Sequence, residues 1–203
     1  MTVAAPLPVR MFSSDVGDPE EEARRLCQAS AAVGPTAGQS LLIRVGARHT
    51  LAVRADGERM MAFRLLGHGP VMLAASQAAA ASASGTAAAR VVRAAAEQVA
   101  ERGRLETLLG ATCPIVGTAG IARAVITLGS TGGSKATLEQ IHTATDTLGM
   151  NWAERKRPGR LQQGWIEPML VGAAVLGAVL ARLGATEIIA EAEAPVDKTL
   201  EID

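Results

Sequence analysis

Three apolar runs separated by turn residues dominate the segment from residue 41 to residue 66. The runs are Leu41–Val45, Leu51–Val53 and Met60–Leu66. Gly46 ends the first run, where the chain has to turn back tightly. Asp56-Gly57 separates the other two and predicts a type I′ hairpin turn, because that turn needs positive φ. The pattern therefore predicts three consecutive antiparallel strands.

Helical periodicity and capping residues surround this segment. Asp18 is a suitable cap and Pro19 a suitable first residue for a helix that runs to about Ala32. Residues 71–102 are rich in alanine and helical in period, with a break expected near 82–86. We therefore expect one charged helix before the strands and two helices after them.

The second half of the chain alternates short strands with helices. Strands are predicted at 112–116 and 186–190, and helices at 121–128, from Thr137 to about Gly149, and at 165–183. Thr137 with Gln140 three residues later forms a capping-box pattern, and Gly184 is a suitable helix stop. The order indicates an α/β protein with a mixed five-stranded sheet, three antiparallel strands first, and helices packed on it.

Composition narrows the class of partner. The 203 residues carry no formal net charge, which argues against a nucleic-acid or anionic-membrane partner. Residues 1–16 lack a signal-peptide pattern and are expected to form an arm, and residues 191–203 an acidic tail. The most apolar segment, Met169–Leu183, is too short to span a bilayer. Cys27 and Cys113 show no metal or redox spacing, so we expect idle thiols in a cytoplasmic protein.

Few residues suggest chemistry on their own. The strand before Gly117-Thr118-Ala119-Gly120 and the helix after it would expose backbone N–H groups suited to an anion, although close strand–helix packing explains the glycines equally. The basic loop 155–160 is typical of a solvated surface. His49, His68 and His142 match no metal spacing, so no metal site is expected.

Four ordered blocks resemble the exopolyphosphatase/guanosine pentaphosphate phosphohydrolase (Ppx/GppA) family, a branch of the actin-like ATPase (ribonuclease H-like) fold. The blocks are GDPEEEARR, LLIRVGARHTLAV, IVGTAGIARAV and EPMLVGAAVLGAVLARLGATEI, which together cover about residues 17–190. The resemblance implies a subdomain that is the second of two in the family, with the active site in the cleft between them. It also implies a homodimer, or a partner protein that supplies the first subdomain.

The catalytic motif departs from the family pattern. With Thr50 aligned to the family threonine, Arg44 stands where the family has its metal-linked aspartate, and Leu51 replaces the glutamate. Gly46 is kept, Ala47 and Arg48 replace two glycines, and His49 replaces serine. Gly117 and Gly120 of the second phosphate loop are kept, with Thr118 between them. Glu21 and Glu22 match the block whose glutamate the family implicates in catalysis.

Two functional hypotheses follow. The first is a non-catalytic protein that acts as a scaffold or binds phosphate, polyphosphate or a guanine nucleotide through a concavity of the turn and the second loop. That concavity would contain Arg44, Gly46, Arg48, His49, Thr50, Gly117, Thr118 and Gly120. The second is a Mg²⁺-dependent hydrolase half, with Glu21 or Glu22 as its catalytic acid and a partner chain completing the site. An alternative to anion binding is that Arg44 and Arg48 pair with Glu20–Glu22 and fill the former cleft.

Overall fold

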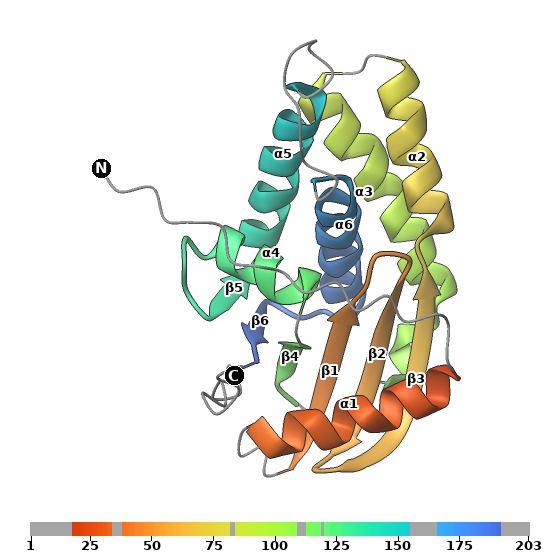
Figure 1. Ribbon diagram of the computed structural model, residues 1–203, viewed down its shortest axis with the longest axis vertical. Helices are drawn as coiled ribbons and strands as arrows, with labels where there is room; N and C mark the ends of the chain where they lie inside the picture. The colour runs from red at the N-terminus through yellow and green to blue at the C-terminus, as the bar shows by residue number, and fades with distance from the viewer. Residues whose placement is uncertain are drawn as a thin grey trace, which may run out of the picture.

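The predicted three-strand meander forms one half of the sheet (Figure 1). Its strands are β1 (Gln39–Val45), β2 (His49–Asp56) and β3 (Arg59–Gly67), which pair antiparallel in the order of the chain. The computed structural model describes residues 18–33, 38–81, 84–108, 113–118, 120–154 and 166–191. The arm, the basic loop 155–160 and the acidic tail beyond Glu191 lie outside these residues.

The other half of the sheet contains three short strands. They are β4 (Ile115–Thr118), β5 (Lys135–Thr137) and β6 (Glu187–Ala190), and the sheet order is β3-β2-β1-β4-β6-β5. The β1–β4 and β4–β6 pairs are parallel, and the β5–β6 pair is antiparallel. The prediction of five strands was therefore wrong by one. β5 has only three residues, too few for a period of two to be recognised in the sequence.

The hairpin turn between β2 and β3 is of a different type from the predicted one. Asp56 pairs with Arg59, so Gly57 and Glu58 are the two central residues. Gly57 has φ of +57°, and Glu58 is not among the described residues with positive φ. Positive φ at the first central position alone is the type II′ pattern, in which glycine takes that position.

β4 begins and ends later than the predicted strand 112–116. Pro114 has no N–H to donate, and its carbonyl accepts a 3.0 Å hydrogen bond from Leu41 N at the start of the parallel pair. The paired residues then continue to Thr118. Gly117 and Thr118 therefore belong to the strand and not to the turn that follows it.

The helices follow their predicted caps closely. They are α1 (Pro19–Val33), α2 (Gly69–Ala80), α3 (Gly85–Arg102), α4 (Ile121–Gly129), α5 (Leu138–Glu154) and α6 (Ile166–Arg182), with a 3₁₀ turn, η1, at Leu105–Leu108. Asp18 Oδ1 accepts a hydrogen bond from Glu20 N at 3.0 Å. The capping box is present in both directions, with Thr137 N to Gln140 Oε1 at 2.8 Å and Gln140 N to Thr137 Oγ1 at 3.2 Å. The expected break in the alanine-rich segment separates α2 from α3.

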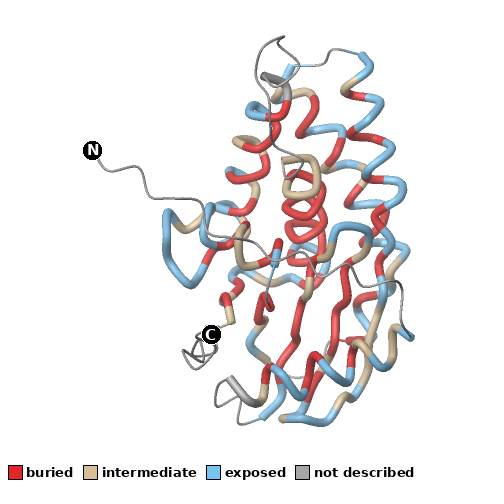
Figure 2. Tube along the Cα trace, in the orientation of Figure 1, coloured by how far each residue is buried: buried red, intermediate tan, exposed pale blue. Residues whose placement is uncertain are grey.

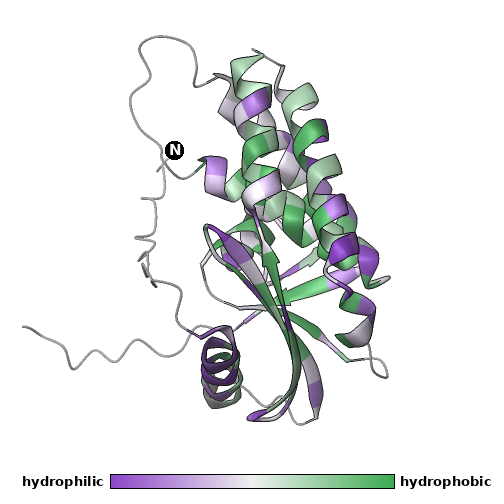
Figure 3. Ribbon diagram, turned by 90° about the vertical axis from the view of Figure 1, so that its right-hand side faces the viewer, coloured by the Kyte–Doolittle hydropathy of each residue, from purple (hydrophilic) through white to green (hydrophobic). Residues whose placement is uncertain are grey.

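The two faces of the sheet bury separate cores. Of the helices in the described ranges, only α1 lies on one side of the sheet, opposite the layer of the other helices (Figure 3). Its buried residues Ala23, Leu26 and Cys27 pack with Leu42, Leu51 and Val53 of the strands. On the other face α6 is buried along its length (Figure 2), with every residue from Leu170 to Leu180 inside. Each buried Val or Leu there contributes about 1.5–3 kcal/mol to folding.

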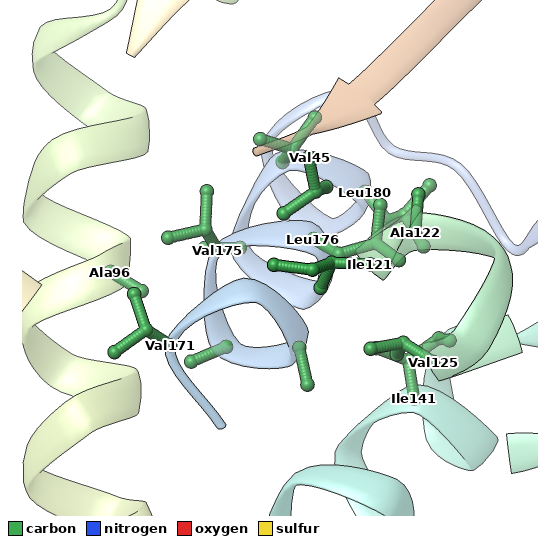
Figure 4. Close-up of a cluster of buried hydrophobic side chains, with 14 of the residues drawn as sticks. Val45, Ala96, Ile121, Ala122, Val125, Ile141, Val171, Val175, Leu176 and Leu180 are labelled. Atoms are coloured by element: carbon green, nitrogen blue, oxygen red, sulfur yellow. The ribbon is translucent and has the colours of Figure 1, made fainter. Parts of the chain in front are cut away.

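α6 also positions the loops at one edge of the sheet. Val171, Val175 and Leu176 of α6 lie in one cluster with Val45 at the end of β1 and Ile121 at the start of α4 (Figure 4). A Cβ on Gly172 would lie 2.4 Å from Ile121 Cγ2 and 2.9 Å from Val45 Cγ1. Glycine at 172 therefore lets α6 approach both the end of β1 and the start of α4 closely. Among the described residues, no helix has both the length and the apolar character that a bilayer-spanning segment needs.

Candidate functional site

The carboxyl ends of β1 and β4 lie side by side, because the two strands are parallel and Arg44 is paired with Thr118. The turn 46–48 after β1 and the α4 start after β4 therefore meet at one edge, which we call the carboxyl edge. A Cβ on Gly120 would lie 3.9 Å from the Val45 carbonyl oxygen. The fold thus brings together the turn after β1 and the loop before α4, the two loops that were predicted to bind phosphate.

Glu22 and Glu21 take different places. Glu22 reaches the carboxyl edge from α1: its Oε1 lies 2.9 Å from Arg44 Nη1, and its Oε2 lies 3.5 Å from His49 Nε2. Glu21 instead forms an i,i+4 ion pair with Arg25 on the exposed surface of α1, with 55% of its side chain exposed. Of the two predicted acids, only Glu22 contacts the predicted site in the described part of the chain.

Arg44 and Arg48 also differ, although the sequence left the same alternatives open for both. Arg44 forms the predicted pair with the acidic start of α1, and 31% of its side chain remains exposed. Arg48 is exposed at the tip of the turn and forms no ion pair within the described part of the chain. Arg44 is therefore already paired with an acid, while Arg48 leaves a positive charge exposed to solvent.

Thr50 is buried beneath the turn and its hydroxyl has a partner. Thr50 Oγ1 and His68 Nε2 lie 2.8 Å apart, and both residues are fully buried. His68 N donates to the Arg48 carbonyl at 2.8 Å, so the same residue also fixes the end of the turn. Thr50 therefore contributes to the site through the turn it supports, since its hydroxyl does not face solvent.

Burial lowers the pKa of His68 to about 4; the Ala47 carbonyl opposes part of this effect, and the positive charge of protonated His49 adds to it. His68 Nδ1 has no hydrogen-bond partner within the described residues, although the Ala47 carbonyl is near enough to act on the ring. An imidazole in this position is neutral at physiological pH. His68 was predicted to be an isolated histidine, and its role in supporting the turn through Thr50 and Arg48 was not predicted.

Gly117 and Thr118 are structural. A Cβ on Gly117 would lie 2.5 Å from Ile126 Cδ1, so a side chain there would have to displace Ile126, and glycine suits the close strand–helix packing. Thr118 is fully buried, and its hydroxyl lies 3.5 Å from the Ile43 carbonyl. The packing explanation that the sequence left open therefore accounts for Gly117.

Gly46 and Gly120 shape the two loops. Gly46 N donates to the His49 carbonyl at 2.9 Å and closes the turn. Gly120 caps α4 with φ of +65° and ψ of −130°, a conformation that residues other than glycine rarely adopt. The first N–H groups of a helix have no partner inside the helix and carry its positive dipole end, so α4 begins with donors suited to an anion.

One further acid lies at the carboxyl edge. Glu191 follows β6, its N–H donates to the Gly117 carbonyl at 2.9 Å, and its Oε1 is buried without a hydrogen-bond partner in the described ranges. Glu191 falls within the predicted acidic tail. Nothing in the sequence distinguishes it from the other acids there, so its position beside the sheet could not be predicted.

The fold was compared with solved structures. The crystal structure of an exopolyphosphatase-like protein is similar to this chain, with a TM-score of 0.66. The two sequences are 18% identical, and the match covers 87% of this chain and 62% of that chain. A Ppx/GppA family member from Aquifex aeolicus is 17% identical, with a TM-score of 0.64 over 85% of this chain and 58% of that chain. An exopolyphosphatase from Cytophaga hutchinsonii is 10% identical, with a TM-score of 0.51.

This chain has the Ppx/GppA fold. At these identities the likeness concerns the fold, and the chain spans about three fifths of the length of the Ppx/GppA structures. The sequence matches no family model, and no curated protein matches it. The predicted resemblance to the Ppx/GppA architecture is thus confirmed by structure.

The residues at the carboxyl edge of this Ppx/GppA fold do not suit Mg²⁺. Arg44 places a positive charge beside the Glu22 carboxylate, and a hard cation needs several oxygen ligands. The described residues contain no group of three or more His, Cys, Asp or Glu side chains arranged to hold a metal ion. The exposed Arg48 guanidinium and the N–H groups at the start of α4 are donors, which suit an anion better than a metal ion.

Proposed function

We propose that this chain is a non-catalytic Ppx/GppA-like protein that binds a phosphate-bearing ligand at the carboxyl edge. The observation that carries the proposal is the 2.9 Å ion pair between Arg44 and Glu22. It joins the residue that replaces the family aspartate to the acid that resembles the family's catalytic glutamate.

Hydrolysis of a phosphoanhydride needs a positioned metal ion and a base that orients water. Arg44 can supply neither, and Leu51, in the place of the family glutamate, is fully buried. Glu22 Oε1 is already paired with the Arg44 guanidinium at 2.9 Å, so this oxygen is not free to orient a water molecule. Phosphate binding does not need these carboxylates, because it depends on hydrogen-bond donors and positive charge.

Three features support an anion as the ligand. Arg48 is exposed at the turn, α4 begins beside it, and Gly120 leaves the backbone there without a side chain. Arginine binds phosphate oxygens in pairs, and a helix start adds donors of fixed direction. Phosphate, polyphosphate and guanine nucleotides, the ligand class implied by the fold, all present such oxygens.

The test combines hydrolysis with binding. The purified chain with Mg²⁺ should release no phosphate from polyphosphate, guanosine pentaphosphate or ATP above background, while calorimetry detects binding of tripolyphosphate. Metal-dependent release that Glu22→Gln abolishes would overturn the non-catalytic function. Failure to bind any phosphate compound would overturn the binding function.

A second candidate is a hydrolase half that another chain completes. It is favoured by the position of Glu22, the acid that matches the family's catalytic block, at the carboxyl edge. On this hypothesis the chain is the second actin-like subdomain and its partner, or a second copy, supplies the other wall in the cytoplasm. Activity that appears only when a chain with the first subdomain is added would favour it over the first proposal.

A further inference from the structure

The Glu22 carboxylate contacts two side chains of the carboxyl edge, one with each of its oxygens. Oε1 contacts Arg44 on β1 at 2.9 Å, and Oε2 contacts His49 on β2 at 3.5 Å. The exposed side-chain fractions are 18% for Glu22, 31% for Arg44 and 20% for His49. We call these three residues the Glu22 cluster. It shows a carboxylate bound where the proposed ligand would place a phosphoryl group.

We propose that Glu22 is a built-in competing ligand, and that a phosphoryl group binds Arg44 and His49 by displacing it. The inference rests on the proposed function and adds its regulation. The ligand is a doubly charged tetrahedral oxyanion, such as the terminal phosphoryl group of an inorganic polyphosphate. Glu22 therefore lowers affinity, opposite to the role of a catalytic glutamate.

The contacts make such an exchange feasible. The cluster is partly exposed, and ion pairs in that setting are weak because water competes for both charges. A phosphoryl group carries more negative charge than a carboxylate and presents three oxygens to Arg44, His49 and the adjacent Arg48. The incoming anion can therefore gain more from Arg44 and Arg48, the two permanent cations, than is lost when Glu22 leaves.

Displacement of Glu22 by a ligand would also affect α1. Glu22 lies near the start of α1, and its pair with Arg44 is a polar link between that end of the helix and the sheet. The apolar residues Ala23, Leu26 and Cys27 hold the rest of the helix. Ligand binding should thus loosen the first turn of α1 and leave its remainder in place.

The experiment measures inorganic pyrophosphate binding by calorimetry for the wild type, Glu22→Gln and a matched control, Glu21→Gln. Glu21 lies in the same turn and carries the same charge, but it pairs with Arg25 on the surface. Removal of either acid changes the net charge equally, so the difference between the variants isolates the contact with Arg44. We expect Glu22→Gln to bind about two- to fivefold more tightly than Glu21→Gln, the upper part of the range for loss of a partly exposed competing pair. The gain should vanish in an Arg44→Gln background.

Each outcome decides between the two proposals. Equal affinities of Glu22→Gln and Glu21→Gln, with the wild type binding, overturn the competition and leave the proposed function intact. Absence of binding in the wild type and in Glu22→Gln overturns the proposed function and the competition together. Binding by Glu22→Gln alone supports the competition. Hydrogen exchange in the wild type gives an independent test, since pyrophosphate should speed exchange in the first turn of α1, and slower exchange there would contradict displacement.

Discussion

Thr50 Oγ1 lies 2.8 Å from His68 Nε2, and neither residue has measurable exposure to solvent. The pair joins the start of β2 to the residue before α2, across eighteen positions of the chain. Because His68 N also donates to the Arg48 carbonyl, the geometry of the proposed ligand turn depends on a buried neutral imidazole.

The first prediction is that His68 makes folding sensitive to acid. Its pKa of about 4 in the fold lies below the ordinary value of 6.5, so the unfolded chain binds more protons between these two values. The contribution of His68 to the free energy of unfolding is fully present above pH 6.5. It decreases by roughly 3 kcal/mol as the pH drops from 6.5 toward 4. Denaturant melts at pH 7 and pH 4 should show a smaller loss for His68→Asn than for the wild type. His49→Asn is the control and should keep most of the loss; an unchanged loss in His68→Asn contradicts the assignment.

The second prediction concerns the contact between α3 and α5. A Cβ on Gly149 would lie 2.7 Å from the Gly85 carbonyl oxygen and 2.8 Å from Ala89 Cβ. Gly149→Ala should therefore destabilise the fold by about 1–3 kcal/mol, despite the better helix propensity of alanine. Gly69→Ala is the matched control, because nothing lies within 4 Å of a Cβ there. Chemical denaturation compares the two, and an equal effect would show that α3 and α5 can separate without cost.

The third prediction tests the exposed cation of the turn. Arg48→Ala should weaken tripolyphosphate binding by about 1–3 kcal/mol, the value of a charge-assisted hydrogen bond. The loss should diminish in high salt, since exposed charges are screened. Arg90→Ala, at an exposed position on α3, removes the same charge and should leave affinity unchanged. Calorimetry at two salt concentrations measures both, and equal losses would indicate general attraction by net charge.

The fourth prediction concerns the capping box at α5. Thr137→Ala removes the acceptor for Gln140 N and should cost about 1 kcal/mol of stability. Thr143→Ala is the control: that hydroxyl donates to the Glu139 carbonyl inside the helix, a bond that adds little to helix stability. Thermal melts of the two variants should differ, and a neutral Thr137→Ala would show that tertiary packing alone positions the start of α5.

The sequence predicted the features that depend on neighbouring residues. Asp18 and Thr137 cap their helices as predicted, and Gly184, with φ of +64°, ends α6. Such signals are local, because a cap or a left-handed residue acts within one turn of the chain. β5 was missed because its pairing with β6 comes from the tertiary structure, and Lys135 and Thr137 give it no apolar pattern.

The candidate site was predictable as a location but not in its contacts. The two glycine-containing loops meet because parallel strands bring them together, which the order of elements implied. The choice of Glu22 over Glu21 depends on which side of α1 faces the sheet, and Ala23 and Cys27 fix that side by packing. The roles of His68 and Glu191 depend on contacts far along the chain, for which the sequence contains no local signal.

The parallel pairing of β1 with β4 also has a consequence for the folding pathway. β1, β2 and β3 are hairpin-connected, and hairpins close within microseconds. The contact from Thr118 to Ile43 spans 75 positions, so β4 must close a long loop before it pairs. During synthesis the meander emerges first and exposes an unpaired β1 edge until the later segment arrives. A nascent chain paused before β4 would therefore be prone to aggregation, and the carboxyl edge would form only after β4 and the start of α4 have been synthesised.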